Sequence, residues 1–249
     1  MRLLIVSDIH GRYNQFIKLL KYVGYKNSDY LFNLGDMVDR GPDSYKVVEW
    51  FRTMNIATDG RVQCLFGNHE HMFISYHTGH IPKKDYCNKF IGGQKALDSY
   101  AGKDKELITH IDFMSKLPLY LETDDYVFTH GGLDINKPLH KQSVHDCAWD
   151  YNKLYQQDIN YNGKTIVYGH TPTIYIYEHY GSKGYEIWKT KNQIAIDVGF
   201  SKARKLLMYD LTNDIEYYYD FASKKCYTVN KKEDKLYETI WSRFIIKWF

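Results

Sequence analysis

The sequence predicts an α/β fold: two packed, mixed β-sheets with helices outside them, four-layer-like, and a functional site where strands end. Three observations predict it. Short apolar runs recur along the chain, and each ends in a tight turn that carries Asp, Asn or His. Two of these runs, at 3–6 and 30–34, precede stretches with helical periodicity, which implies parallel strands with right-handed crossovers. The last part of the chain instead has closely spaced strand-like runs.

The two crossover helices are predicted at residues 13–22 and 45–54. Each stretch has apolar side chains at the spacing of one helix face. They are Phe16, Leu19, Leu20 and Val23 in the first, and Val47, Val48, Trp50 and Phe51 in the second. These helices alternate with strand-like runs, including one at 62–66, so we expect the core of the first sheet to be parallel.

The middle of the chain, at about 71–124, is predicted to be a helical insertion that covers the site. Helical stretches at 71–77, 86–101 and 106–117 are interrupted by glycines and a proline. Further strands are expected at 126–128 and 165–168. The runs at 194–196, 205–211 and 215–219 predict a second, more antiparallel sheet.

The chain is predicted to divide into one domain at 1–222 and a tail at 223–249. Lysines at 224, 225, 231 and 232 mark a polar connection, and residues 233–249 have paired apolar positions every four residues. We expect an amphipathic helix there that packs on the body of the chain. Pairing with a second copy is the alternative, and binding to a membrane surface is less favoured because the polar face has few positive charges.

Composition and the pattern of apolar runs predict the general type of protein. The net charge of +3 gives no argument for a nucleic-acid or membrane surface. Four widely spaced cysteines, Cys64, Cys87, Cys147 and Cys226, indicate reduced side chains in a cytoplasmic protein. The N-terminus enters the first strand directly, so no signal peptide is expected, and no apolar run is long enough to span a bilayer.

Five predicted strand ends carry side chains of the types that bind metals. Apolar runs lead into the following candidates: Asp8 and His10, Asp36, Asn68, His130, and His170. Oxygen and imidazole ligands without a thiolate suit Mn²⁺, Fe or Zn²⁺. The turn at 35–41 adds Asp39 and Arg40, and the Arg40 guanidinium suits a phosphate because it offers a planar fork of N–H donors.

The ordered series of motifs resembles the calcineurin-like metallophosphoesterases. The series is Asp8-x-His10-Gly11, Gly35-Asp36-x-Val38-Asp39-Arg40-Gly41, Gly67-Asn68-His69-Glu70, His130-Gly131-Gly132 and Gly169-His170-Thr171-Pro172. Within that group the Asp39-Arg40-Gly41 and Asn68-His69-Glu70 segments are similar to the phosphoprotein phosphatase family, in its bacterial and phage branch. The resemblance runs from Asp8 to about Gly199.

The resemblance implies a site for two metal ions. One is assigned to Asp8, His10 and Asp36, and the other to Asp36, Asn68, His130 and His170, so Asp36 bridges. A hydroxide shared by the two metals would attack the phosphorus directly. Mn²⁺ is expected to support activity in vitro, with Fe or Zn²⁺ as alternatives.

Three further side chains are expected to act on the substrate. His69 would be the general acid, Asp39 would favour its protonated ring through a hydrogen bond, and Arg40 would bind phosphoryl oxygens. The alternative for His69 is a structural histidine that supports the metal ligands. Asp197, near the last strand-end motif, is expected to support the ligands rather than to react.

The sequence departs from the family at two positions. Ser7 replaces the usual glycine, which changes little because serine is also small. Tyr151 stands where relatives usually have a second phosphate-binding arginine, and residues 131–170 contain no arginine. Tyr151 is therefore a candidate substrate-binding residue, and the departure affects substrate identity rather than the metal ligands.

The favoured function is a phosphomonoester hydrolase, specifically a serine/threonine protein phosphatase. The expected substrate is then a phosphorylated protein or a small phosphoester. Hydrolysis of a dinucleoside polyphosphate, such as diadenosine tetraphosphate, is the alternative. A binding or regulatory module with slow turnover and a nuclease-type phosphodiesterase are weaker hypotheses, the latter because no basic stripe is evident.

Overall fold

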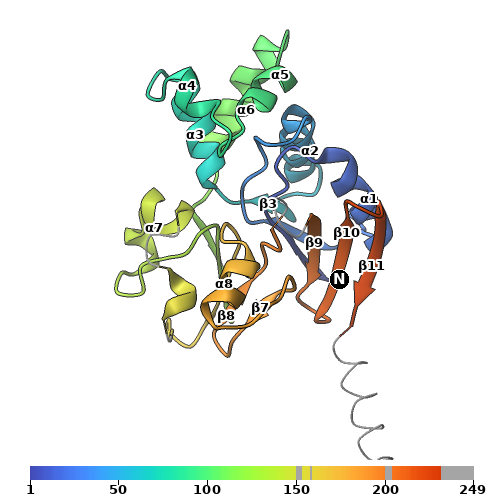
Figure 1. The fold of residues 1–249 in the computed structure, drawn as a ribbon, viewed down its shortest axis with the longest axis vertical. Helices are drawn as coiled ribbons and strands as arrows, with labels where there is room; N and C mark the ends of the chain where they lie inside the picture. The colour runs from blue at the N-terminus through green and yellow to red at the C-terminus, as the bar shows by residue number, and fades with distance from the viewer. Residues whose placement is uncertain (150–152, 158, 200–203, 231–249) are drawn as a thin grey trace, which may run out of the picture.

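The computed structural model describes residues 1–149, 153–157, 159–199 and 204–230. Within them the chain forms two mixed β-sheets flanked by helices, which confirms the predicted fold class (Figure 1). Tyr151 and the tail helix expected at 233–249 lie outside the described residues.

The first sheet has six strands in the order β11-β10-β9-β1-β2-β3. Its bounds are β1 (Leu3–Val6), β2 (Tyr30–Asn33), β3 (Val62–Cys64), β9 (Lys205–Asp210), β10 (Ile215–Asp220) and β11 (Lys225–Val229). β1, β2 and β3 are parallel, as the two crossover helices predict, whereas β9 runs antiparallel to β1.

The second sheet has five strands in the order β4-β5-β6-β8-β7. Its bounds are β4 (Tyr120–Glu122), β5 (Tyr126–Thr129), β6 (Thr165–Tyr168), β7 (Trp188–Lys189) and β8 (Gln193–Ala195). β5, β6 and β8 are parallel, and β4 and β7 form antiparallel edges.

The expectation that the strands after residue 193 form one second sheet is wrong. β8 pairs with β6, whereas β9 and β10 join β1 in the other sheet. β9 is buried on both faces, because one face packs under the helices and the other packs against the second sheet. A short apolar run identifies such a strand but not its partners, because strand pairing depends on contacts between residues distant in sequence.

The unexpected strand β11 extends the first sheet beyond residue 222, where the domain was expected to end. It pairs with β10 from Glu216↔Val229 to Asp220↔Lys225. Its side chains are exposed or half-buried, as is usual at a sheet edge, so its apolar pattern is weak. The polar connection predicted at residues 224 and 225 therefore lies partly within the sheet.

Helices cover the outer faces of the sheets. α1 (Tyr13–Val23) and α2 (Ser44–Ala57) pack on the first sheet, and their apolar faces lie where the sequence predicts them. The shorter α7 (Val144–Ala148) and α8 (Thr173–His179) lie beside the second sheet, with 3₁₀ turns at Leu139–Lys141 and Leu154–Gln156 (Figure 1).

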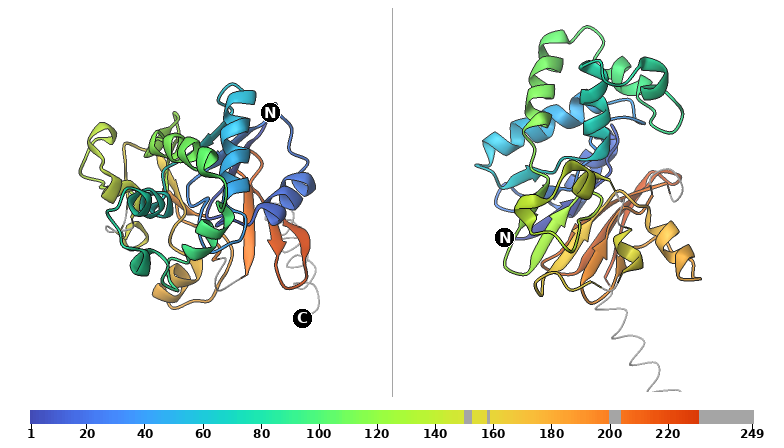
Figure 2. Two further views of the ribbon diagram at one scale, coloured as in Figure 1. Left: turned by 90° about the horizontal axis from the view of Figure 1, so that it is seen from above. Right: turned by 90° about the vertical axis from the view of Figure 1, so that its left-hand side faces the viewer.

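A helical segment projects from one end of the two sheets, as the views in Figures 1 and 2 agree. It comprises α3 (Asn68–His77), α4 (Lys83–Tyr86), α5 (Gln94–Ser99) and α6 (Asp104–Ser115). The prediction of one helix at 86–101 is wrong over residues 87–93, which form a turn between α4 and α5. Asn88 Oδ1 accepts the N–H groups of Phe90 and Ile91 at 2.8 and 3.0 Å, an alternative to helical hydrogen bonding.

The space between the two sheets is a hydrophobic core. Alternate residues of a strand face opposite sides, so Ile5 and Phe32 point between the sheets while Leu4 and Leu31 pack under the helices. The ring of Phe32 meets Phe128 of the second sheet edge to face, with centroids 5.2 Å apart. This contact helps to fix one sheet against the other, and with them the strand ends that carry the site.

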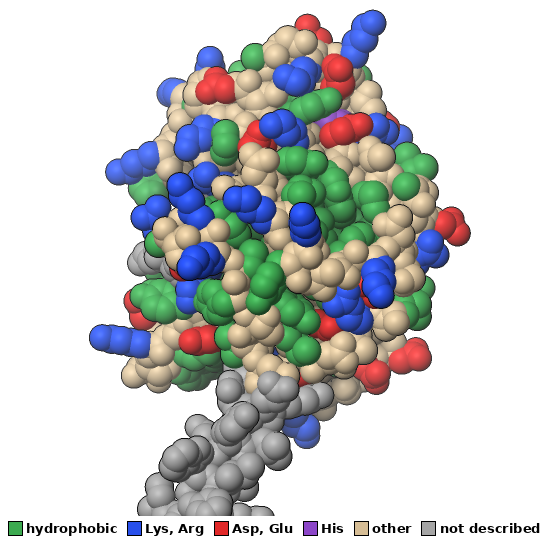
Figure 3. All heavy atoms as spheres, turned by 90° about the vertical axis from the view of Figure 1, so that its right-hand side faces the viewer, with side chains coloured by type: hydrophobic (Ala, Val, Ile, Leu, Met, Phe, Trp, Pro, Cys, Tyr) green, Lys and Arg blue, Asp and Glu red, His purple; other side chains and the backbone are tan. Residues whose placement is uncertain are grey.

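The described surface is mixed in character. On the face in Figure 3, Lys and Arg side chains are spread among acidic and hydrophobic ones instead of forming one stripe. All four cysteines are free thiols. None of the helices in the described ranges has both the length and the apolar character needed to cross a membrane.

Candidate metal centre

The six predicted metal ligands converge at one edge of the two sheets. Parallel strands end at the same edge, so the turns after β1, β2 and β3 bring Asp8, His10, Asp36 and Asn68 together. The turns after β5 and β6 bring His130 and His170 to the same place from the second sheet. All six side chains belong to the described residues, and five of them are nearly fully buried.

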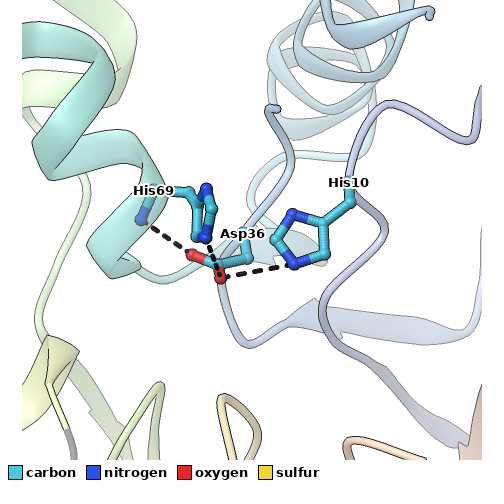
Figure 4. A group of neighbouring side chains, drawn as sticks. All are labelled: His10, Asp36 and His69. Carbon is cyan, nitrogen blue, oxygen red and sulfur yellow. Dashed lines mark hydrogen bonds and ion pairs between the residues drawn. The ribbon is translucent and has the colours of Figure 1, made fainter. Parts of the chain in front are cut away.

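Asp36 lies at the middle of this arrangement. Its Oδ2 atom is 3.6 Å from His10 Nε2 and 3.9 Å from His69 Nε2 (Figure 4). Its Oδ1 atom faces the other side and is 3.3 Å from His130 Nε2. The two oxygens of this short side chain therefore point toward two neighbouring groups of potential metal ligands, which is the arrangement that a bridging ligand requires.

The remaining ligand candidates complete the two groups. Asp8 Oδ1 lies 3.8 Å from His10 Nε2. Asn68 Oδ1 lies 3.0 Å from both His130 Nε2 and His170 Nδ1. Two sets of side chains that share Asp36 have ligand atoms within 4.8 Å of one another: His10, Asp36 and His69, and Asp36, His130 and His170. Asp8 and Asn68 lie next to these sets and offer further oxygen atoms.

The orientation of the imidazole rings also fits metal binding. The Nδ1 atoms of His10 and His130 donate to the carbonyls of Val38 and Leu34 at 2.9 and 2.8 Å. Each ring therefore directs Nε2 into the site, and this is the usual support of a ligating histidine. His10 Nε2 accepts a hydrogen bond from Arg40 at 2.6 Å, which identifies that nitrogen as an acceptor.

The charge of the site also calls for a cation. Burial raises the pKa of Asp8, and it raises that of Asp197 well above its ordinary value. Burial opposes ionisation of Asp36 too, but His130 and His69 hold its pKa well below normal. Although burial disfavours a charged imidazole, Asp36 raises the pKa of His130 to about 10. A buried pocket that retains a proton so strongly is suited to divalent cations.

His69 lies between Asp36 and a second carboxylate. Its Nδ1 atom is 2.7 Å from Asp39 Oδ2, and Asp39 is fully buried. The hydroxyl of Tyr86 donates to the other oxygen of Asp39. The predicted contact between His69 and Asp39 is therefore present. Tyr86 was not anticipated, because a single tyrosine at the end of a helical stretch carries no sequence signal for such a contact.

Glu70 connects the loops that carry the ligands. It is fully buried, and its carboxylate accepts the N–H groups of Asp36, Met37 and Gly67 at 2.8, 2.7 and 3.0 Å. Burial raises its pKa to about 7. A side chain on Gly67 would overlap both Asp36 Oδ1 and Glu70 Oε2, which explains the glycine before Asn68. The motif at 67–70 thus has a positioning residue that the sequence analysis missed.

Replacing Glu70 by Gln is expected to destabilise the fold. The amide nitrogen cannot accept a hydrogen bond, so a buried backbone N–H loses its partner at a cost of about 1–3 kcal/mol. Thermal melting followed by circular dichroism should show a Tm several degrees lower. The control is Glu178→Gln, which makes the same chemical change at an exposed position. An unchanged Tm in Glu70→Gln contradicts the role assigned to Glu70.

The backbone of the site is strained. Six of its non-glycine residues have a positive φ between 47° and 69°, a region that side chains disfavour. They are Asp8, His10, Asp36, Asp39, Arg40 and His170. Such strain persists only where surrounding contacts determine the conformation, and in proteins it concentrates at functional sites.

The other predicted site residues have different positions. Arg40 is half-buried and reaches His10, and its backbone N–H donates to the Gly92 carbonyl at 3.2 Å. Asp197 is buried near Asp8, and its Oδ1 accepts the Gly199 N–H at 2.8 Å. Tyr151 lies outside the described residues, so the structure does not place it.

These features define a metallophosphoesterase of the two-sheet α/β class. The family of calcineurin-like phosphoesterases matches residues 1–199. The chain belongs to this family, whose members hydrolyse phosphoester bonds and depend on two metal ions.

Two curated relatives have names that refer to nucleotides. A symmetrical bis(5'-nucleosyl)-tetraphosphatase from Buchnera aphidicola is 36% identical over 96 residues, which are 37% of this chain and 34% of that protein. The asymmetrical bis(5'-nucleosyl)-tetraphosphatase PrpE from Bacillus velezensis is 29% identical over 192 residues, covering 68% of this chain and 76% of its own length. The first match thus spans about a third of the relative.

A solved structure shows the same fold. The cold-active protein-tyrosine phosphatase of a psychrophilic Shewanella species superimposes with a TM-score of 0.60 and 17% identity, covering 91% of this chain and 80% of the other. At this identity the likeness supports the architecture of the chain and carries no statement about its substrate.

Proposed function

We propose that the chain hydrolyses phosphoric ester and anhydride bonds with two metal ions. The observation that carries this proposal is the position of Asp36, whose two oxygens face separate donor groups. Asp8, His10 and Asp36 would hold one ion, and Asp36, Asn68, His130 and His170 the other. Bound there, the ions supply an acidified water molecule and neutralise charge on the phosphoryl oxygens.

The side chains around the ions have separate roles in the proposal. Arg40 lines the cleft beside the metal ligands, where a phosphoryl group would lie. It binds phosphoryl oxygens after giving up its hydrogen bond to His10. His69 donates the proton on Nε2 to the leaving-group oxygen as the bond from phosphorus to that oxygen breaks. Asp39 holds Nδ1 and orients the ring, and Tyr86 donates a hydrogen bond to Asp39 in turn.

A dinucleoside polyphosphate is the substrate class that we favour. The sequence motifs alone favour a serine/threonine protein phosphatase, but the named relatives act on bis(5'-nucleosyl) tetraphosphates. The absence of an arginine at position 151 also weakens the case for a site that grips a single phosphate with two guanidinium groups.

A comparison of three substrates in the presence of Mn²⁺ tests this choice. They are diadenosine tetraphosphate, a phosphoserine peptide and bis-p-nitrophenyl phosphate. We expect kcat/KM for the dinucleotide to exceed that for the phosphopeptide by about tenfold or more, a difference of roughly 1.4 kcal/mol in transition-state binding. A higher kcat/KM for the phosphopeptide would restore the protein phosphatase hypothesis. No turnover of any substrate would favour the binding-module hypothesis.

A further inference from the structure

A cleft opens beside the candidate metal centre. Its volume is about 720 Å³, and Arg40 and His170 line the part next to the metal ligands. The turn at 87–93 and the start of α5 form another part of its lining, and Pro172 and Tyr175 contribute from α8 and the residue before it. The cleft is continuous with the site and has room for more than one phosphoryl group.

The charge of the cleft exceeds what one phosphate requires. Four cationic side chains line it: Arg12, Arg40, Lys89 and Lys95. No Asp or Glu occurs among the lining residues that the structure describes. Arg40 and two divalent cations would already match a single phosphoryl group. Asp43 partly offsets the charge of Arg12, so Lys89 and Lys95 are the main cations beyond that need, and they indicate a ligand with additional negative charge.

Two aromatic side chains accompany these cations. Phe90 is 76% exposed and Tyr175 is 41% exposed, although both line the cleft. Phe90 is held in a defined turn, because Asn88 Oδ1 accepts its N–H and the Asn88 carbonyl accepts the N–H of Gly92 at 2.8 Å. Lys89 Nζ lies 5.1 Å from the centre of the Phe90 ring. Exposed rings next to cations are the combination that binds nucleotides by stacking and charge.

We propose that this cleft binds the part of the substrate beyond the phosphorus that is attacked. Lys89, Lys95 and Arg12 bind the following phosphates, and Phe90 and Tyr175 stack on a nucleobase. The proposal rests on the proposed function for the reaction itself, but the binding surface is built from side chains other than the metal ligands. An acidic phosphopeptide offers negative charge without a base and fits the aromatic pair less well.

Calorimetric titration of the full chain, loaded with Mn²⁺ and freed of excess metal, tests the phosphate part. The probes are inorganic phosphate and inorganic tripolyphosphate. In Lys89→Ala/Lys95→Ala the Kd for tripolyphosphate should rise by about 3- to 20-fold, and the Kd for phosphate by less than about twofold, since each exposed lysine contributes a modest attraction. An equal loss for both probes overturns the assignment.

A matched control variant removes the same charge elsewhere. Lys84→Ala/Lys105→Ala deletes two exposed lysines that do not line the cleft. We expect this variant to bind tripolyphosphate as the wild type does. If it loses as much affinity as the cleft variant, the effect comes from net charge and the proposed subsite is wrong.

A second pair of probes, ADP and pyrophosphate, tests the stacking part. Phe90→Ala should raise the Kd for ADP by about 5- to 100-fold while the Kd for pyrophosphate changes little, because only ADP has a base to stack. Phe90→Tyr keeps the ring and should restore ADP binding. An ADP affinity that is the same in Phe90→Ala as in the wild type overturns the assignment of Phe90.

The outcomes separate this proposal from the proposed function. If the variants change tripolyphosphate and ADP binding as expected but the wild type hydrolyses no dinucleotide, the proposed reaction is wrong and the proposed subsite stands. If the dinucleotide is hydrolysed but both cleft variants bind every probe normally, the subsite is wrong and the reaction stands. If an acidic phosphopeptide binds more tightly than ADP, and Lys89→Ala/Lys95→Ala weakens its binding as much as that of tripolyphosphate, the cleft binds peptides and the proposal is overturned.

Discussion

Replacing Asp36 by Asn should reduce kcat/KM by about 10³-fold or more and weaken binding of both metal ions. The physical reason is that a neutral amide offers one oxygen, whereas the two oxygens of Asp36 face two separate donor groups. Without the shared ligand, both ions would be held less well. The charge stabilisation that they give the transition state, worth several kcal/mol, would be lost. Turnover and metal content per chain should both be measured, with Mn²⁺ in excess.

The control for this variant is Asp112→Asn, which makes the same change at a side chain that is 61% exposed on α6. It should retain wild-type turnover and metal content. If Asp36→Asn also keeps near wild-type turnover, Asp36 does not bridge two ions. If it loses turnover but still binds two ions per chain, its role lies in the reaction and not in holding the metals.

Replacing His69 by Asn should lower kcat by about 10²–10⁴-fold on substrates with a poor leaving group, the range expected for loss of a general acid. The loss should be much smaller for p-nitrophenyl phosphate, because its leaving group departs without a proton. Metal content should be unchanged. His80→Asn, at an exposed histidine beside α3, is the control and should behave as the wild type.

This variant also decides between two roles that the geometry allows. His69 Nε2 lies 3.9 Å from Asp36 Oδ2, within the group that also includes His10, so His69 is placed well enough to be a ligand. Loss of one metal ion in His69→Asn would make it a ligand. Equal losses of kcat on good and poor leaving groups would make it a positioning residue.

Much of the fold follows from local patterns in the sequence. The buried strands β1 and β2 and the helices α1 and α2 lie where apolar spacing predicts them, because each buries one clear face against the same core. The convergence of the candidate ligands follows from the same pattern, since parallel strands end at one edge.

The remaining features depend on contacts that local patterns do not encode. The partner of β9 is β1, about 200 residues earlier in the chain, and the edge strand β11 has little apolar character. The three hydrogen bonds accepted by Glu70 and the contact of Tyr86 with Asp39 join separate segments. The left-handed conformations at the site depend on the same long-range packing. Asp and His adopt such a conformation more often than most residues, but this preference is too weak to predict it at a given position.

Anomalous diffraction from crystals of the full chain grown with Mn²⁺ tests the central claim most directly. The account predicts two anomalous peaks that share Asp36. One should contact Asp8 and His10, and the other should contact Asn68, His130 and His170. A single peak, or two peaks that share no ligand at Asp36, would contradict the two-metal site on which the proposed function rests.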